Sequence, residues 1–123
     1  MTYAGIILFK ENKFLLPLRD NKPNITYPHY WGIFGGGVEK GETPQQAIVR
    51  ELQEELGLKI ENPELILKNK FKGETRYTFK QEIKDISGLQ LNEGKEMRLF
   101  TKEEILNLKN TVPYLKRLIK KYF

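Results

Sequence analysis

Cysteine is absent from this chain, and histidine occurs only once, as His29. Without cysteine there can be no disulfide, no thiolate nucleophile and no cysteine-ligated zinc site. A single imidazole cannot build a histidine-based metal cluster. The 16 Asp and Glu residues are therefore the only abundant metal-binding side chains in the sequence.

The chain also lacks an apolar run long enough to span a bilayer. Residues 1–9 lack the charged lead and the cleavage site of a secretory signal. We therefore expect a cytoplasmic protein with no membrane partner. A length of 123 residues, 39% of them hydrophobic and 30% charged, fits one compact domain over residues 1–123.

The net charge of +5 is compatible with anionic partners, although lysine-rich surfaces are common in ordinary proteins. Part of this excess lies in residues 114–122, where basic and apolar residues alternate at helical spacing. The pattern predicts an amphipathic helix that packs its apolar stripe on the protein, and this interpretation is favoured over a membrane or RNA role. The sequence leaves a homodimer open.

Apolar and β-branched runs predict a series of strands. They cover residues 3–9, 13–19, 31–34, 65–71, 75–83, 89–91 and 97–100. Residues 20–30 are polar and predict a surface loop. A short helix is predicted to start near Thr101, and Pro113 is predicted to open a last helix. This order of elements predicts a mixed α/β domain with helices packed on the sheet.

One more helix has well-marked ends. Thr43 is a good N-cap, Pro44 suits the first helical position, and Gly57 supplies the stop. The strand predicted at 31–34 runs into glycines 35–37, which predict a flexible turn before the helix. Flexible backbone beside a helix N-terminus often cradles phosphates, although three glycines are also consistent with a simple tight turn.

Three glutamates share one face of this helix. Glu51, Glu54 and Glu55 stand at relative positions zero, three and four, so their carboxylates lie on neighbouring turns. These like charges repel, and oxygen ligands of this kind suit Mg²⁺ or Mn²⁺ beside a phosphate. Ala47 falls in the same arc, where its small side chain would leave room for an ion. A solvated face on which Arg50 pairs with Glu54 is the alternative.

These glutamates belong to a longer pattern of residues at set spacings. Gly36 is followed after five residues by Glu42, and after seven more by Arg50, Glu51 and Leu52. One residue later come Glu54 and Glu55, and one residue after those come Gly57 and Leu58. This pattern closely resembles the Nudix hydrolase signature, and every fixed position matches. The resemblance implies a MutT-like α/β/α sandwich with a mixed, partly antiparallel sheet.

The activity implied by the resemblance is hydrolysis of a diphosphate bond in a nucleoside diphosphate linked to another group. A nucleoside triphosphate or a nucleotide sugar would be such a substrate, and Mg²⁺ or Mn²⁺ the cofactor. The charges of a diphosphate repel a nucleophile unless cations screen them. A non-catalytic nucleotide-binding sensor and an RNA 5′-end pyrophosphohydrolase are the alternatives. Sensors of this type usually lose signature glutamates, and this chain has lost none.

The resemblance also implies the roles of the signature residues. Glu51, Glu54 and Glu55 would bind the metal, with the Gly36 carbonyl as a further ligand. Glu51 and Glu54 would also be catalytic residues. Arg50 would orient these glutamates and is counted with the catalytic residues.

Other residues of the pattern would support the site. Glu42 would brace the loop through Arg50 or through backbone N–H groups, and Gly57 would end the helix. Related enzymes take a general base from the signature or from a later loop, where Glu93 and Glu96 are the candidates. Glu96 is favoured as a base or extra ligand, with a solvated loop glutamate as an equal alternative.

Residues that choose the substrate are expected outside the signature. The rings of Tyr27 and Tyr30 could stack a base. Arg19 and Arg76 could meet phosphates, although a solvated role is favoured for each. Phe34 stands where many relatives have proline, a departure that bears on the substrate class more than on catalysis.

Overall fold

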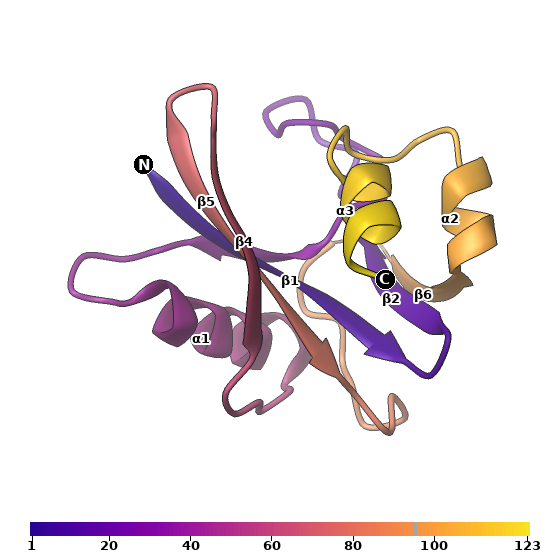
Figure 1. The fold of residues 1–123 in the computed structure, drawn as a ribbon, viewed down its shortest axis with the longest axis horizontal. Helices are drawn as coiled ribbons and strands as arrows, with labels where there is room; N and C mark the ends of the chain where they lie inside the picture. Colours follow the sequence, from indigo (N-terminus) through magenta and orange to yellow (C-terminus); the bar gives the residue numbers. More distant parts are fainter. Residues whose placement is uncertain (95) are drawn as a thin grey trace.

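The computed structural model describes residues 1–94 and 96–123. In this part of the chain one six-stranded sheet carries helices on both faces (Figure 1). The strands are β1 (Thr2–Lys10), β2 (Lys13–Leu18), β3 (Phe34–Gly37), β4 (Glu64–Phe71), β5 (Glu74–Glu82) and β6 (Glu96–Thr101). The helices are α1 (Pro44–Leu56), α2 (Lys102–Asn107) and α3 (Leu115–Tyr122).

The sheet is mixed because β1 runs parallel to β5 and antiparallel to its other partners. The strand order is β4-β5-β1-β2-β6, and β3 pairs with β1. The first half of β1 pairs with β3, from Tyr3 opposite Gly37 to Ile6 opposite Phe34. Its last residues pair with β2 instead. β1 therefore pairs with β3 and then with β2 along the same edge. The predicted mixed, partly antiparallel sheet is confirmed.

Alternate residues of β1 pack into different cores, as the two-residue period of a strand requires. Ala4 and Ile6 belong to the buried cluster that includes Leu52 of α1. Ile7 belongs to the second cluster, which includes Ile119 of α3. Figure 1 shows α1 on one side of the sheet and α2 and α3 on the other. The prediction of an α/β/α sandwich is confirmed.

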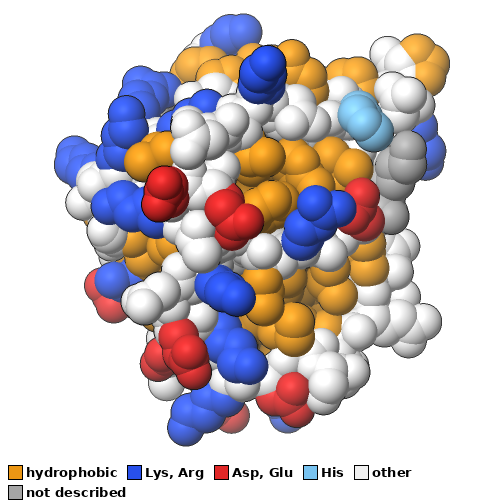
Figure 2. All heavy atoms as spheres, turned by 90° about the vertical axis from the view of Figure 1, so that its right-hand side faces the viewer, with side chains coloured by type: hydrophobic (Ala, Val, Ile, Leu, Met, Phe, Trp, Pro, Cys, Tyr) orange, Lys and Arg blue, Asp and Glu red, His pale blue; other side chains and the backbone are white. Residues whose placement is uncertain are grey.

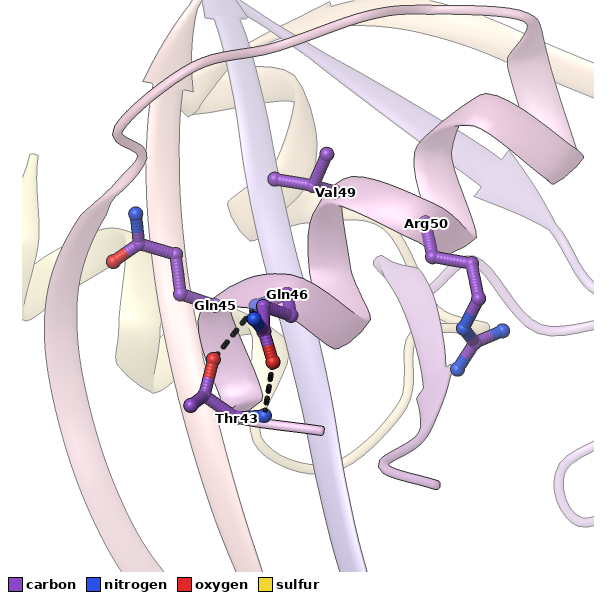
Figure 3. Close-up of a pocket in the computed structure, with 5 residues that line it drawn as sticks. All are labelled: Thr43, Gln45, Gln46, Val49 and Arg50. Carbon is purple, nitrogen blue, oxygen red and sulfur yellow. Dashed lines mark hydrogen bonds between the residues drawn. The ribbon is translucent and has the colours of Figure 1, made fainter. Parts of the chain in front are cut away.

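The ends of α1 lie where local sequence predicts them. The Thr43 hydroxyl accepts a hydrogen bond from the Gln46 N–H, and the Gln46 side chain accepts one from the Thr43 N–H, at 3.1 and 2.9 Å (Figure 3). Pro44 occupies the first turn, and Gly57 ends the helix with φ 65°. Thr101 caps α2 in the same way. None of the helices in the described residues is long and apolar enough to cross a membrane.

Two of the strand predictions are wrong. Trp31 makes only isolated bridges, to Leu18 and Thr111, and β3 begins at Phe34 and contains the glycines that were predicted to form a turn. Residues 89–91 form no strand, although Leu89 and Leu91 pack against the core beneath α1. Their apolar character reflects this packing, and the N–H of the residue between them bonds to the end of α1.

Glycine is required in β3 because this strand approaches β1 closely. A Cβ atom built on Gly35 would lie 2.2 Å from the Ala4 carbonyl oxygen, and Gly35 has a φ of 148°. Gly37 has open space around it and an ordinary φ. The glycine run therefore brings backbone, without side chains, to the point where β3 meets α1.

We predict that Gly35→Ala lowers the free energy of unfolding by about 1–3 kcal/mol from backbone strain alone, with the steric clash adding to this loss. Gly37→Ala should stay within about 0.5 kcal/mol of the wild type. Urea denaturation followed by the fluorescence of Trp31 measures both. Equal stability of the two variants would contradict the role given to Gly35.

Candidate active site

Two of the three glutamates of α1, Glu51 and Glu55, contact the glycine strand. A Cβ on Gly36 would lie 2.3 Å from Glu51 Oε1, so the Glu51 carboxylate rests against a backbone that has no side chain there. The Gly35 N–H donates a hydrogen bond of 3.2 Å to Glu55 Oε1. Exposure falls across the set, from 58% for the Glu54 side chain to 13% for Glu51 and 8% for residue Glu55. The site thus runs from solvent into the contact between α1 and β3.

Arg50 joins the separate parts of this site. Its Nε and Nη2 atoms lie 2.7 and 3.0 Å from the two carboxylate oxygens of Glu42, a bidentate pair. Nη1 donates to Glu51 Oε1 at 3.1 Å and lies 3.3 Å from Glu54 Oε2. Nη2 also donates to the Gly37 carbonyl at 3.1 Å. A single guanidinium therefore ties α1 to β3 and to the loop between them.

Glu42 holds that loop through two kinds of contact. It accepts the hydrogen bonds of Arg50, and its Oε1 atom accepts one of 2.9 Å from the Glu39 N–H. The Arg50 guanidinium, followed by the Glu39 N–H, lowers the pKa of Glu42 below its ordinary value. Both of the contacts expected for Glu42 are present in the structure.

The site carries more negative charge than Arg50 offsets. Burial, the charge of Glu93 and the charge of Glu51 raise the pKa of Glu55 to about 8, against the hydrogen bond from Gly35. Burial also raises the pKa of Glu51, with Arg50 acting in the opposite direction. Buried carboxylates that repel one another are stabilised by an added cation.

The donor set fits a hard divalent cation in its chemistry. Carboxylate oxygens on adjoining turns lie beside a glycine backbone, so that hard oxygen ligands are gathered at one place. In residues 1–94 and 96–123, no three acidic or imidazole side chains converge closely enough to hold an ion. The reason is that the Glu54 carboxylate is hydrogen-bonded to Arg50, and the Glu55 carboxylate accepts a hydrogen bond from the Gly35 N–H. Ala47 leaves no room for an ion, contrary to expectation, because it is fully buried in the core beneath α1.

The structure does not bring Glu96 to these glutamates. Glu96 begins β6, and its carboxylate pairs at 3.1 Å with Arg98, two residues along the strand. The Arg98 guanidinium lies over the Trp31 ring, 5.5 Å from its centroid, on the face of the sheet that carries α2 and α3. Glu93, the other candidate, precedes β6, and its negative charge raises the pKa of two glutamates of α1.

Arg76 lies among aromatic rings on the face of the sheet opposite α1. Its guanidinium carbon is 5.2 Å from the Tyr114 centroid, 5.3 Å from that of Phe71 and 5.7 Å from that of Tyr3. Its Nη2 atom is 3.7 Å from Glu74, and its Nε is buried with no hydrogen-bond partner in the part of the chain that the structure describes. Sequence reasoning gave no sign of this ring cluster, because only the pairing of strands brings its members together.

The remaining predicted substrate residues lie in the loop between β2 and β3. Arg19 Nε donates to the Thr26 carbonyl at 2.8 Å, which commits this side chain to its own loop. The rings of Tyr27 and Tyr30 contact each other, with centroids 5.8 Å apart. The ring contacts of Arg76 come from Tyr3, Phe71 and Tyr114 and not from this loop, as far as the described residues show.

Glu42→Gln should destabilise the protein at pH 7, and the difference from the wild type should shrink as the pH falls. A carboxyl whose folded pKa is lowered contributes stability above its unfolded pKa, and this stability is lost as pH falls through the folded pKa. Urea denaturation at pH 7, 5 and 3.5 measures the difference. A gap that stayed constant would show that ionised Glu42 contributes nothing to the fold.

Comparison with known proteins agrees with this geometry. A model of the NUDIX domain matches residues 1–122. An uncharacterized Nudix hydrolase of Listeria monocytogenes is 33% identical, with 89% of this chain and 70% of that protein covered. Two further relatives match over shorter stretches. An RNA pyrophosphohydrolase of Francisella tularensis is 37% identical over 67% of this chain and 45% of its own length. An 8-oxo-dGTP diphosphatase of Proteus vulgaris is 40% identical over 46% and 49%.

The fold has matches among solved structures as well. The crystal structure of a MutT protein from Methanosarcina mazei superimposes with a TM-score of 0.80 at 17% identity, covering 98% of this chain and 91% of that one. The match to the domain model spans nearly the whole chain and includes both the glycine strand and the glutamate helix. The protein therefore belongs to the Nudix family of hydrolases, enzymes that cleave pyrophosphate bonds and generally use divalent metals.

Proposed function

We propose that this protein hydrolyses a diphosphate bond in a nucleoside diphosphate linked to another group, of the nucleoside triphosphate or nucleotide-sugar type, in the cytoplasm. The observation that carries the proposal is the contact between carboxylates and bare backbone. Glu51 rests against Gly36, and Glu55 accepts a hydrogen bond from Gly35. A diphosphate can approach this backbone closely because the glycines have no side chains.

Glu51, Glu54, Glu55 and the Gly36 carbonyl would hold Mg²⁺ or Mn²⁺. Bound there, the ion would screen the phosphate charges and favour attack by water. Glu54 is the most exposed of the three glutamates, and among the described residues its carboxylate pairs with Arg50 alone, at 3.3 Å, so it is free to turn toward an ion. Arg50 would orient the carboxylates of Glu51 and Glu54.

A proton must leave the attacking water as the bridging P–O bond breaks and two phosphorylated products form. Glu93 is the loop carboxylate best supported for receiving this proton. Its charge acts on both Glu51 and Glu55, whereas Glu96 is paired with Arg98. Glu51 and Glu54 remain further candidates for this step because they adjoin the proposed metal position.

The nucleoside would bind at Arg76 among its rings. Arg76, Tyr3 and Gly37 are lateral neighbours across β5, β1 and β3. A nucleotide with its base near Tyr3 and Tyr114 can therefore extend past Gly37 toward the glutamates of α1. Planar rings beside a guanidinium suit base stacking and phosphate contact together. Arg19, Tyr27 and Tyr30 have weaker support, since their contacts lie within one loop.

The 8-oxo-dGTP diphosphatase relative supports a nucleoside triphosphate as substrate. The RNA pyrophosphohydrolase relative supports the second candidate, removal of diphosphate from an RNA 5′ end.

The face in Figure 2 favours the small substrate, because acidic side chains interrupt the basic ones and hydrophobic side chains fill its middle. A steep loss of activity with salt on RNA, but not on free nucleotides, would favour RNA. A sensor would bind nucleotides without turnover.

A panel of nucleoside triphosphates and nucleotide conjugates should include a substrate that is hydrolysed with Mg²⁺ or Mn²⁺ and not with EDTA. Glu54→Gln should lower kcat at least about 100-fold. It should leave the melting temperature near that of the wild type, because Glu54 is exposed. Glu64→Gln, an exposed glutamate on β4, is the matched control and should keep full activity. Failure of every substrate with either metal would refute the proposal.

Arg76→Lys should raise KM about tenfold and change kcat less than about threefold, since the planar stack is lost in substrate binding while the glutamates are untouched. Arg117→Lys, an exposed arginine on α3, is the control. Steady-state kinetics with the best substrate of the panel measure both variants. An unchanged KM for Arg76→Lys would remove Arg76 from the substrate site.

A further inference from the structure

The last carbonyl groups of α1 need hydrogen-bond donors from outside the helix. The last turn of a helix leaves its carbonyls without intrahelical partners. One of them is satisfied just beyond the helix end, where the Gly57 N–H donates to the Gln53 carbonyl at 3.0 Å; the Leu58 N–H donates to the preceding carbonyl, that of Leu52, at 3.3 Å. The carbonyls of residues 54–56 remain.

A distant loop supplies the missing donors. Asn92 Nδ2 donates to the Glu54 carbonyl at 3.0 Å, and the Asn92 N–H donates to the Glu55 carbonyl at 2.8 Å. The Gln90 N–H donates to the Leu56 carbonyl at 3.1 Å. Asn92 therefore holds the backbone of the two glutamates that complete the acidic face.

We propose that Asn92 is a positioning residue that fixes the loop carboxylate of Glu93 against the acidic face of α1. The inference rests on the proposed function, because it gives Glu93 its place in the hydrolytic site. Asn92 is bonded to α1 by its side chain and its backbone, and Glu93 is the next residue in the chain.

The chain passes close to the sheet on the other side of Glu93. Gly94 has a φ of 92°, and a Cβ there would lie 3.1 Å from the Leu18 carbonyl oxygen of β2. Glu93 thus lies between the hydrogen bonds of Asn92 to α1 and the close approach of Gly94 to β2. The effect of its charge on the pKa of Glu51 and of Glu55 agrees with this placement.

Such a clamp matters because proton transfer depends on distance. A reacting group misplaced by about 1 Å can cost about 100-fold in rate. An ordinary helix cap would affect stability alone, so the two roles differ in their effect on kcat. Asn107 offers a matched comparison, because its Nδ2 donates to the Glu103 carbonyl of α2 at the same 3.0 Å.

The experiment compares Asn92→Ala, Asn92→Asp and Asn107→Ala. Asn92→Ala should lower kcat about 10- to 100-fold, the range for residues that orient a reacting group, and keep KM within about threefold. Asn92→Asp should not restore activity, since a carboxylate keeps the shape but cannot donate to the Glu54 carbonyl. Asn107→Ala should lower the melting temperature by a similar amount and keep kcat within about twofold.

A double-mutant cycle tests whether Asn92 acts through Glu93. In the presence of Glu93→Gln, adding Asn92→Ala should lower kcat less than about twofold. Multiplicative losses would overturn the proposal, as would a wild-type kcat in Asn92→Ala.

Hydrogen exchange gives a readout that needs no substrate. The amides of residues 90 and 92 should exchange faster in Asn92→Ala and at the wild-type rate in Asn107→Ala. If the wild-type protein hydrolysed nothing, the proposed function would fail, and this exchange would still decide whether Asn92 holds the loop. Equal exchange in all three proteins would overturn the clamp.

Discussion

The site depends on the balance between one guanidinium and the carboxylates around it. Arg50 forms a bidentate pair with Glu42 and reaches Glu51, Glu54 and the Gly37 carbonyl. These contacts join the helix, the loop and the glycine strand, so the position of each depends on the same side chain. The bidentate fork needs arginine, because lysine carries a single point charge. The single positive charge of Arg50 cannot offset the negative charges of all these carboxylates. Burial makes the charged form of Glu55 still less favourable.

In the proposed site, the path of β1 connects the two faces of the sheet. Its first half pairs with β3 on one side and β5 on the other. This places Arg76, Tyr3 and Gly37 in a row that leads from the ring cluster beneath α3 to the strand that α1 contacts. Because β3 consists largely of glycine, nothing but backbone stands at the end of that row. A sheet with ordinary side chains in β3 would separate the ring cluster from the glutamates.

Predictions succeeded where the deciding interactions are local and failed where the partner is distant. Thr43 and Gly57 bound α1 as predicted, since caps form with residues three to five positions away. The glycine segment became a strand because β1 lies beside it. Residues 89–91 did not, because the Gln90 N–H bonds to the end of α1 and the Leu89 N–H bonds to Ile86. The alternation of strand faces turns Glu96 toward Arg98, a pairing that the sequence pattern did not predict.

The sequence by itself determined the family, the helix that carries the glutamates and their common face. Each of these follows from spacing within one stretch, residues 36–58, or from hydrogen bonds between near neighbours. Only the tertiary structure decided which distant groups meet this stretch: the ring cluster around Arg76, the clamp of Asn92 and the approach of Glu93. Strand pairing joins Tyr3 to Arg76, and a helix-to-loop hydrogen bond joins Glu54 to Asn92, 38 positions along the chain; no local pattern in the sequence records such pairs.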